Sequence, residues 1–344
     1  MGKTTPSVRS IARLAGFSKA TVANALRGDR SVAPVTAERI RRVATKVGYE
    51  RNNLVTGLMS AMRRSQTTGF HGVLASIDFA EPDRPAHGPF HLDLVAGSRA
   101  RADELGYKIE EFVVGAGALS LARLESILKA RGIHGIMVLP SWRPPNLAGL
   151  DWVDFAAVSA DLLPPPLQLH SVGCDHYRSV FSLLEFLWAR GYRRPGLVLE
   201  SGRDERDMLR RSAALQAFQR RVPRAHRVPL LDASVLDPSV FGDWFRRYRP
   251  DVLLAHETGL IEMVEAEGAA VPTDCGFVCL NLAKTKRACA GLDLQPRLIG
   301  ARSVELLIAQ LQQNVRGIPE YPSTLTLAAR VVEGPTLEPR GPIR

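Results

Sequence analysis

Apolar runs of strand length alternate with segments of helical periodicity through most of this chain. In the first series the strand-like runs cover 72–77, 107–114 and 133–140, and the helix-like segments cover 94–106 and 120–132. Such alternation is typical of βαβ units, in which helices cover both faces of a parallel sheet. The pattern predicts an α/β core with parallel sheets.

A second series of the same kind begins near Ser171. Its segments are a helix at 177–190, a strand at 195–199, a helix at 209–220, a strand at 251–255, a helix at 260–267 and a strand at 275–280. Asp175 is expected to cap the helix that starts at His176. Because 344 residues exceed one typical core, the two series predict two lobes.

The positive charge of the chain is concentrated at its N-terminus. Residues 1–66 hold 13 lysines and arginines against 3 aspartates and glutamates, an excess that equals the net charge of +10 of the whole chain. The other 278 residues carry 32 basic and 32 acidic side chains. A basic segment joined to a body that is neutral on average is typical of a nucleic-acid-binding protein.

The basic segment is predicted to form three short helices. Ser7 is a suitable N-cap for the first, which should end at Gly16. Ser18 is expected to cap the second, which Gly28 closes, and the third is expected from about Pro34 to Val47. The tight turn between the first two helices is typical of a helix-turn-helix, although three short helices alone would also fit another small bundle.

Three stretches carry a more specific likeness: ARLAGFSKATVANALRG (12–28), VTAERI (35–40) and VGY (47–49). They resemble the headpiece of the LacI/GalR family of bacterial transcription regulators. The resemblance implies that the second helix enters the major groove, with Lys19, Ala20 and Asn24 at the bases. Lysine can donate to guanine, asparagine can pair with adenine, and alanine can only touch a thymine methyl. The candidates for phosphate contacts are Ser7, Ser18, Thr21, Arg27 and Arg30.

Residues 51–66 follow the headpiece, which is assigned to residues 1–50. In the LacI family this stretch is a hinge helix that folds on operator DNA and inserts a leucine into the minor groove, and Leu58 occupies that position. Asn52 or Asn53 can cap the helix, and Asn52 is a further DNA-binding candidate. Arg51, where the family often has proline, and Gly57 both lower helix formation in the free hinge. An ordinary packed linker helix is the alternative.

The body, residues 67–344, contains further stretches that resemble sequences of the family: ELGY (104–107), GIHGIMVL (132–139), ARGYRRP (189–195), VPTD (271–274) and IGARSVELL (299–307). It resembles the family's two-lobed, periplasmic-binding-protein-like (type I) core. The resemblance implies a small-molecule effector in the interlobe cleft, near the carboxyl ends of the strands. It also implies a homodimer on a near-palindromic double-stranded operator, with lobe closure changing the spacing of the headpieces.

The positions that usually bind sugar hydroxyls differ here. His256 and Glu257 replace an Asn-Asp pair, Asn281 and Ser159 each replace an aspartate, and the effector-binding arginine is displaced or missing near Ala214. Their replacement argues against a simple sugar. A differently shaped polar cleft is predicted from Phe79, Phe90, Ser159, Arg211, His256, Glu257 and Asn281. The alternative for each is a role in supporting the fold.

No metal, cofactor or catalytic residue is expected. The four cysteines form no C-x-x-C pair, so they are expected to be reduced and partly buried. His170, Cys174, Asp175 and His176 form the nearest approach to a metal cluster, but a strand end and helix cap explain them more simply. His87 and His91 flank Gly88 and Pro89, which predicts a loop.

The sequence predicts a DNA-binding regulator, a repressor, rather than an enzyme. The N-terminus has no apolar signal-peptide centre and the chain has no run of 18 apolar residues, so a cytoplasmic protein without a membrane contact is expected. Two alternatives are a small-molecule carrier and an enzyme that uses His256 and Glu257 in the cleft. The absence of G-x-S-x-G, P-loop and H-E-x-x-H motifs argues against the enzyme.

Overall fold

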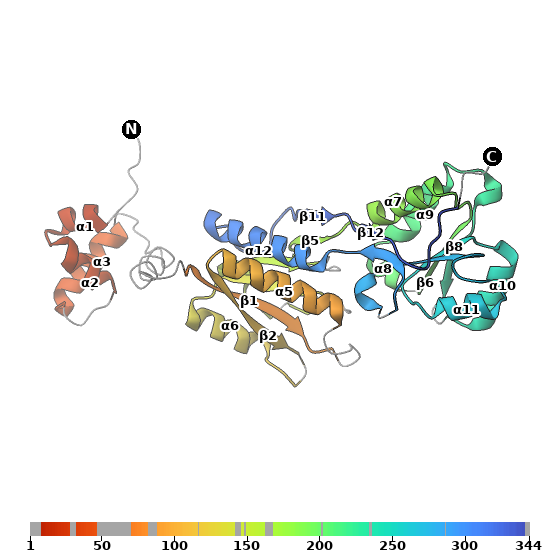
Figure 1. Ribbon diagram of the computed structural model, residues 1–344. Coiled ribbons are helices and arrows are strands. Elements are labelled where there is room, and N and C mark those ends of the chain that lie inside the picture. Colours follow the sequence, from red (N-terminus) through yellow and green to blue (C-terminus); the bar gives the residue numbers. More distant parts are fainter. Residues whose placement is uncertain are drawn as a thin grey trace. The chain divides into compact units, whose positions relative to one another are not determined.

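The computed structural model divides the chain into two compact units, Met1–His71 and Gly72–Arg344 (Figure 1). The residues that it describes are 8–27, 32–46, 70–81, 88–115, 117–141, 146–147, 149–161, 168–200, 202–233, 236–285 and 287–340. The predicted hinge, residues 51–66, therefore lies outside the described residues.

In its described residues the first unit has the helices α1 (Val8–Ala15), α2 (Lys19–Arg27) and α3 (Pro34–Lys46). They enclose a small core of buried side chains from all three helices, namely Ile11, Ala15, Val22, Ala25, Ala37, Ile40 and Ala44. The predicted order of three short helices is confirmed. Because most core residues are alanines, the helices can pack closely despite their short length.

The first lobe of the second unit is built on a six-stranded parallel sheet in the order β11-β5-β4-β3-β1-β2. Its strands are β1 (Gly72–Phe79), β2 (Tyr107–Val114), β3 (Gly135–Val138), β4 (Ala156–Ala160), β5 (His170–Cys174) and β11 (Thr324–Leu327). Helices α5 (Pro89–Glu104) and α12 (Pro296–Gln313) cover one face, and α6 (Leu121–Arg131) covers the other. Because successive strand residues point to opposite faces, Leu74 packs toward α5 while Ala75 packs toward α6.

The second lobe has a sheet in the order β12-β10-β9-β8-β6-β7, parallel except for the β10–β12 pair. Its strands are β6 (Pro195–Glu200), β7 (Leu231–Ala233), β8 (Val252–Ala255), β9 (Gly276–Cys279), β10 (Ala290–Asp293) and β12 (Arg330–Val332). The longer helices are α7 (His176–Ala189), α9 (Arg210–Gln219), α10 (Pro238–Tyr248) and α11 (Leu260–Ala266). Side chains of α7 and α9 pack in one apolar cluster and those of α10 and α11 in another, so both faces are covered.

Short helices complete the second unit. They are η1 (Trp152–Asp154), α8 (Arg203–Arg206), η2 (Arg224–His226) and η3 (Leu282–Lys284). The last of these lies against α5, so a segment that follows β9 of the second sheet contacts a helix of the first lobe.

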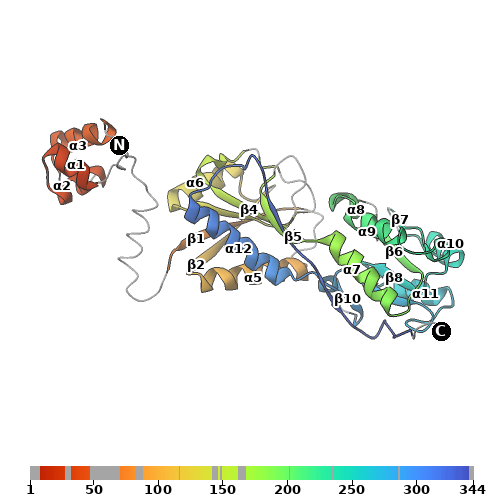
Figure 2. The same cartoon turned by 90° about the horizontal axis from the view of Figure 1, so that it is seen from above.

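Helices α5 and α12 lie side by side in both views (Figures 1 and 2). Two glycines allow their backbones to approach closely. A Cβ atom built on Gly97 would overlap the carbonyl oxygen of Arg297, and one built on Gly300 would overlap that of Leu94. Ion pairs from Arg297 to Asp93 at 2.9 Å and from Arg101 to Glu305 at 2.7 Å flank this contact.

The chain passes between the two lobes three times, after β5, after β10 and after β11. Hydrogen bonds join these passages to one another. The Asp175 N–H donates to the Leu327 carbonyl at 2.8 Å, and the Gln295 side-chain amide donates to the Ala328 carbonyl at 2.7 Å. The Ala329 N–H donates to the Ser179 hydroxyl oxygen at 2.9 Å. The three passages therefore form one hydrogen-bonded junction.

The parallel α/β architecture and the two lobes are confirmed, but the boundary near Ser171 is wrong. That residue belongs to β5 of the first sheet, and α12 and β11 later return to the same lobe. The loop predicted around His91 is also wrong, since His91 lies in the first turn of α5. Pro89 occupies the start of this helix, where the missing proline N–H leaves no intrahelical bond unmade.

Candidate DNA-binding headpiece and effector site

The turn between α1 and α2 depends on Gly16. This residue has φ +74°, and its N–H donates to the Ala12 carbonyl at 3.1 Å. The N–H of Phe17 donates to the same carbonyl at 3.2 Å, which closes the end of α1. Because a positive φ strains residues with a Cβ, glycine is the residue best suited to this turn.

Ser18 begins α2 as its N-cap. The hydroxyl oxygen accepts the N–H of Thr21 at 3.1 Å, and the hydroxyls of Ser18 and Thr21 are 2.8 Å apart. Ser18 and Lys19 are exposed, while Thr21 and Asn24 are half-buried. Val22 and Ala25 are fully buried in the small core of the three helices. The N-terminal turn of α2 is thus anchored from within and presents polar groups outward.

The structure covers only part of the predicted DNA-binding set. Lys19, Ala20, Asn24 and Arg27 all lie in α2, and Ser18 and Thr21 form its cap. Ser7, Arg30, Asn52 and Leu58 lie outside the described residues. The roles assigned to individual side chains remain predictions.

The candidate effector residues come from both lobes, and several follow a parallel strand. Phe79 ends β1, and Phe90 lies in the first turn of α5, each half-buried. His256 and Glu257 follow β8, and Asn281 follows β9. His256 and Asn281 are buried whereas Glu257 is exposed. Since ligands of open α/β folds bind outside the carboxyl ends of strands, this placement suits a ligand site.

Two of the candidates already have structural roles. The Ser159 hydroxyl, buried in β4, donates to the Asp161 carbonyl, and the Asn281 side-chain oxygen accepts the Ala283 N–H at 3.2 Å. The latter bond makes Asn281 the N-cap of η3. These contacts support the alternative that Ser159 and Asn281 stabilise the ends of their strands.

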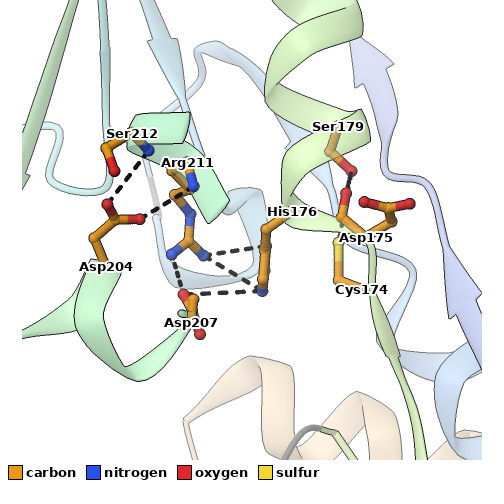
Figure 3. A network of polar contacts seen from close by, with 8 residues as sticks. All are labelled: Cys174, Asp175, His176, Ser179, Asp204, Asp207, Arg211 and Ser212. Atoms are coloured by element: carbon orange, nitrogen blue, oxygen red, sulfur yellow. Dashed lines mark hydrogen bonds and ion pairs between the residues drawn. The ribbon is translucent and has the colours of Figure 1, made fainter. Parts of the chain in front are cut away.

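Arg211 is the centre of a buried polar network (Figure 3). Its guanidinium forms an ion pair with Asp207, which precedes α9, and lies 3.1 Å from His176 Nδ1. Asp204 accepts the backbone N–H groups of Arg211 at 3.1 Å and Ser212 at 3.3 Å. The carboxylates therefore fix both the start of α9 and the direction of the arginine side chain.

His176 is the first residue of α7, after the capping residue Asp175. The Asp175 carboxylate accepts the Arg178 N–H at 2.9 Å, which confirms the predicted cap. Burial, together with the positive charge of Arg211, lowers the pKa of His176 to about 3. A neutral imidazole can accept a hydrogen bond from Arg211, so histidine here supports the arginine without adding charge.

His176, Asp204 and Asp207 were not among the predicted site residues. Asp207 and Arg211 are four positions apart, but they do not share a helix, because Met208 and Leu209 have left-handed φ and α9 begins at Arg210. His176 is 35 positions from Arg211, so their proximity follows from the packing of α7 against α9. No local pattern reveals it.

A second polar pair lies at the end of β1. His91 Nε2 is 3.4 Å from Asp78 Oδ2, and both side chains are largely buried. The other Asp78 oxygen accepts the Phe79 N–H at 2.8 Å. The end of β1 is therefore polar beside the aromatic ring of Phe79.

Within the described ranges, no group of three or more histidine, cysteine, aspartate or glutamate residues could hold a metal ion. The four cysteines are free thiols and buried. Burial raises the pKa of Cys174 and of Cys275 to about 12, which keeps both thiols protonated at neutral pH. Among the helices described, none is long and apolar enough to cross a membrane.

A three-helix unit with a capped second helix precedes a two-lobed core whose chain crosses between lobes three times. This architecture defines the class of headpiece-bearing, periplasmic-binding-protein-like proteins. Residues 7–52 match the profile of bacterial regulatory proteins of the lacI family, and residues 184–337 match that of a periplasmic binding protein-like domain. The first segment of the chain is therefore similar to LacI-family regulators, and the later segment is similar to periplasmic binding proteins.

Three known proteins illustrate the similarity. The HTH-type transcriptional regulator PtxS of Pseudomonas putida is 28% identical over 189 residues, which cover 54% of this chain and 52% of PtxS. The chain thus spans about half the length of the curated relatives it matches.

Two solved structures share the fold over nearly their whole length. A transcriptional regulator CelR–cellobiose complex has a TM-score of 0.55 and 18% identity, covering 96% of this chain and 99% of that one. The lac repressor dimer bound to operator and the anti-inducer ONPF has a TM-score of 0.54 and 16% identity, covering 97% and 99%.

Proposed function

We propose that this protein is a sequence-specific DNA-binding transcriptional regulator, a repressor, whose operator affinity depends on a small-molecule effector. The observation that carries the proposal is the exposed, Ser18-capped start of α2 after the Gly16 turn, within the segment that matches the lacI family. A helix presented in this way can enter the major groove with its first residues at the bases.

In this proposal Lys19 and Asn24 read bases, and Ala20 provides space or a methyl contact. The phosphate contacts come from Ser7, Ser18, Thr21, Arg27 and Arg30. The excess of basic residues in the first 66 positions supplies the affinity that does not depend on sequence. Because one three-helix headpiece contacts few bases, we infer a homodimer that binds the two half-sites of a near-palindrome.

We further propose that the effector binds where Arg211 lies. The guanidinium is buried, oriented by Asp207 and His176, and follows the carboxyl end of β6. An effector oxygen can accept from this preoriented donor, and the Asp207 carboxylate can accept from an effector hydroxyl or amine. His256 and Glu257 after β8 would complete the polar contacts, with Phe79 and Phe90 against an apolar part.

The three-passage junction offers a way to couple effector binding to operator binding. Lobes joined by short crossing segments can rotate as rigid bodies about those segments when a ligand binds between them. Closure would then change the separation of the two headpieces in a dimer. Ligand and operator would influence each other by the same factor, since binding free energies are reciprocally linked.

The first test is selection of bound duplexes from a random DNA pool, sequenced at two salt concentrations. Recovery of a near-palindrome is the expected result. The matched variant is Lys19→Ala, which should change or weaken the preference at one position of each half-site and leave the rest of the site unchanged. Salt-sensitive binding without any sequence preference would contradict the proposal.

The effector is then sought by screening metabolites for a rise in the melting temperature of the protein. Arg211→Lys should abolish the rise for a true effector, because lysine lacks the planar fork that makes two parallel bonds. Arg210→Lys, on the preceding residue of α9, is the control and should retain it. An equal response of both variants would place the effector elsewhere.

A further inference from the structure

Ten arginines occur in three short connections of the second lobe, 190–194, 220–227 and 246–251, whose only acidic residue is Asp251. These connections lead into β6, β7 and β8, which are neighbours in the order β8-β6-β7. Because the three strands are parallel, their first residues lie at the same edge of the sheet. We call the surface formed by these three connections the basic edge.

Arg194 holds the three connections together. Its Nε donates to the carbonyl oxygens of Tyr248 at 3.1 Å and Arg249 at 3.2 Å, and its Nη1 donates to that of Ala225. The ring of His226 also lies 5.6 Å from that of Trp188 at the end of α7. Arginines that are far apart in the sequence therefore belong to one continuous surface.

Most guanidinium groups of the basic edge form no ion pair with a carboxylate in the described structure. Arg190 pairs with Glu333, Arg221 with Glu185, and Arg246 with Asp243 and Glu267. Among the described residues, no carboxylate pairs with the other seven, which are Arg193, Arg194, Arg220, Arg224, Arg227, Arg247 and Arg249.

The side-chain contacts of Arg193, Arg194 and Arg227 are with carbonyl oxygens and a ring. Arg227 donates twice to the Val222 carbonyl, at 3.2 and 3.1 Å, and Arg193 lies 4.5 Å from the centre of the Trp188 ring. The Asp251 carboxylate accepts the backbone N–H groups of Arg193 at 2.6 Å and Arg194 at 2.9 Å. Carbonyls and rings orient a guanidinium without cancelling its net charge, so the basic edge attracts anions.

We propose that the basic edge binds the phosphate backbone of duplex DNA, as a second DNA contact of the protein in addition to the headpiece. Arginine is suited to this role because its planar fork matches a phosphate. Neighbouring strands are about 4.8 Å apart, so three connections span about 10 Å, and a duplex presents about six phosphate charges over that length.

The composition of the basic edge favours phosphate over an acidic polypeptide. None of the large exposed hydrophobic residues of the chain lies in the three connections; Val222 is buried there and Tyr248 half-buried. Protein partners are usually held by a desolvated apolar or aromatic centre, whereas phosphate contacts need only spaced cations. The inference extends the proposed function, since a chain that holds an operator could also hold a second DNA segment.

The experiment is a bridging assay with the full-length protein. Operator duplex on beads is saturated with protein, unbound protein is washed away, and capture of a labelled duplex of scrambled sequence is measured against salt. The test variant is Arg220→Gln/Arg224→Gln/Arg247→Gln, which removes three exposed charges that no carboxylate neutralises in the described structure. The control is Arg123→Gln/Arg178→Gln/Arg330→Gln, which removes three exposed charges elsewhere on the core.

Wild type and control are expected to capture the second duplex, and the test variant to capture it at least tenfold less. The slope of log affinity against log salt should fall by about 2.7 in the test variant, from about 0.9 for each lost phosphate contact. Equal capture by the test and control variants, or no capture by wild type at low salt, would overturn the inference.

Binding to the bead-bound operator is measured first and reports on the proposed function separately. Should no operator be found, the same two variants are compared for direct binding to the scrambled duplex, where only the test variant should lose affinity. A fluorescent polyglutamate peptide is offered in parallel. Capture of the peptide but not of the duplex would assign the basic edge to an acidic protein partner and contradict the proposal.

Discussion

The side-chain amide of Gln295 donates a hydrogen bond to the carbonyl oxygen of Ala328 at 2.7 Å, joining two of the three passages between the lobes. Gln295 precedes α12 in a left-handed conformation, with φ +57°. A residue with a Cβ is strained in this conformation, and the hydrogen bond gives a reason for glutamine to occupy it.

Gln295→Ala should therefore lower stability by about 1 kcal/mol, the usual net contribution of one hydrogen bond. For a protein of this size the melting temperature should fall by about 2 to 4 °C. Thermal unfolding followed by circular dichroism measures the change. Gln312→Ala, at an exposed position of the same helix, is the control and should leave the melting temperature unchanged.

The close contact of α5 and α12 predicts that Gly97→Ala destabilises the first lobe by about 1 to 3 kcal/mol, the typical cost of overpacking. The added methyl group would meet the backbone of Arg297, which cannot move without displacing α12. Urea unfolding gives the free energy. Gly259→Ala is the matched control, because its Cβ would have nothing within 4 Å. Equal stabilities for the two variants would show that the helices separate freely.

The lowered pKa of His176 predicts a loss of stability in acid. The unfolded chain binds a proton near the ordinary pKa of 6.5, while folded His176 does not until about 3. Stability from this group is therefore complete above pH 6.5 and falls as the pH decreases toward 3, with a loss of about 2 kcal/mol by pH 5. His176→Asn should flatten this part of the pH profile of the unfolding free energy. The control variant His71→Asn, at an exposed histidine, should not.

Local sequence signals predicted much of the fold. The strand predicted at 107–114 coincides with β2, and the Asp175 cap and the Gly16 turn are both present. These features depend on residues that are close in the sequence, and they can be predicted from the periodicity of apolar residues and from the preferences of capping residues. Helix α10 was not predicted, although Asp237 and Pro238 provide a start signal and Asp237 accepts the Ser239 N–H at 2.8 Å.

These local signals do not predict which strands pair when they are far apart in the sequence. β11 pairs with β5 across about 150 positions, with Leu325 opposite Val172, so no local pattern indicates that the chain returns to the first lobe. The proximity of Arg211 and His176 at the proposed effector site could not be predicted for the same reason, since it follows from the packing of α7 against α9. The basic edge was hidden because a body with equal numbers of basic and acidic side chains can still separate them in space.

Ser18→Ala should have two separable effects. Loss of the cap on α2 should cost the headpiece about 1 kcal/mol. If Ser18 also contacts a phosphate, operator affinity should fall to a similar degree for every sequence variant of the operator. Ser18→Asp keeps a capping oxygen and adds a negative charge, so it should retain stability and lose affinity. Loss of stability alone in Ser18→Ala would limit this residue to capping.

Leu58→Ala tests the minor-groove insertion implied by the resemblance of the hinge to that of the LacI family. An apolar wedge acts only where the duplex is bent at the centre of the site, so its removal should weaken operator binding strongly. Binding to a scrambled duplex, which depends on phosphate contacts, should change little. Fluorescence anisotropy with both duplexes at one salt concentration gives the ratio of the two affinities. An equal loss on both duplexes would assign Leu58 to general folding of the hinge and remove the insertion from the mechanism.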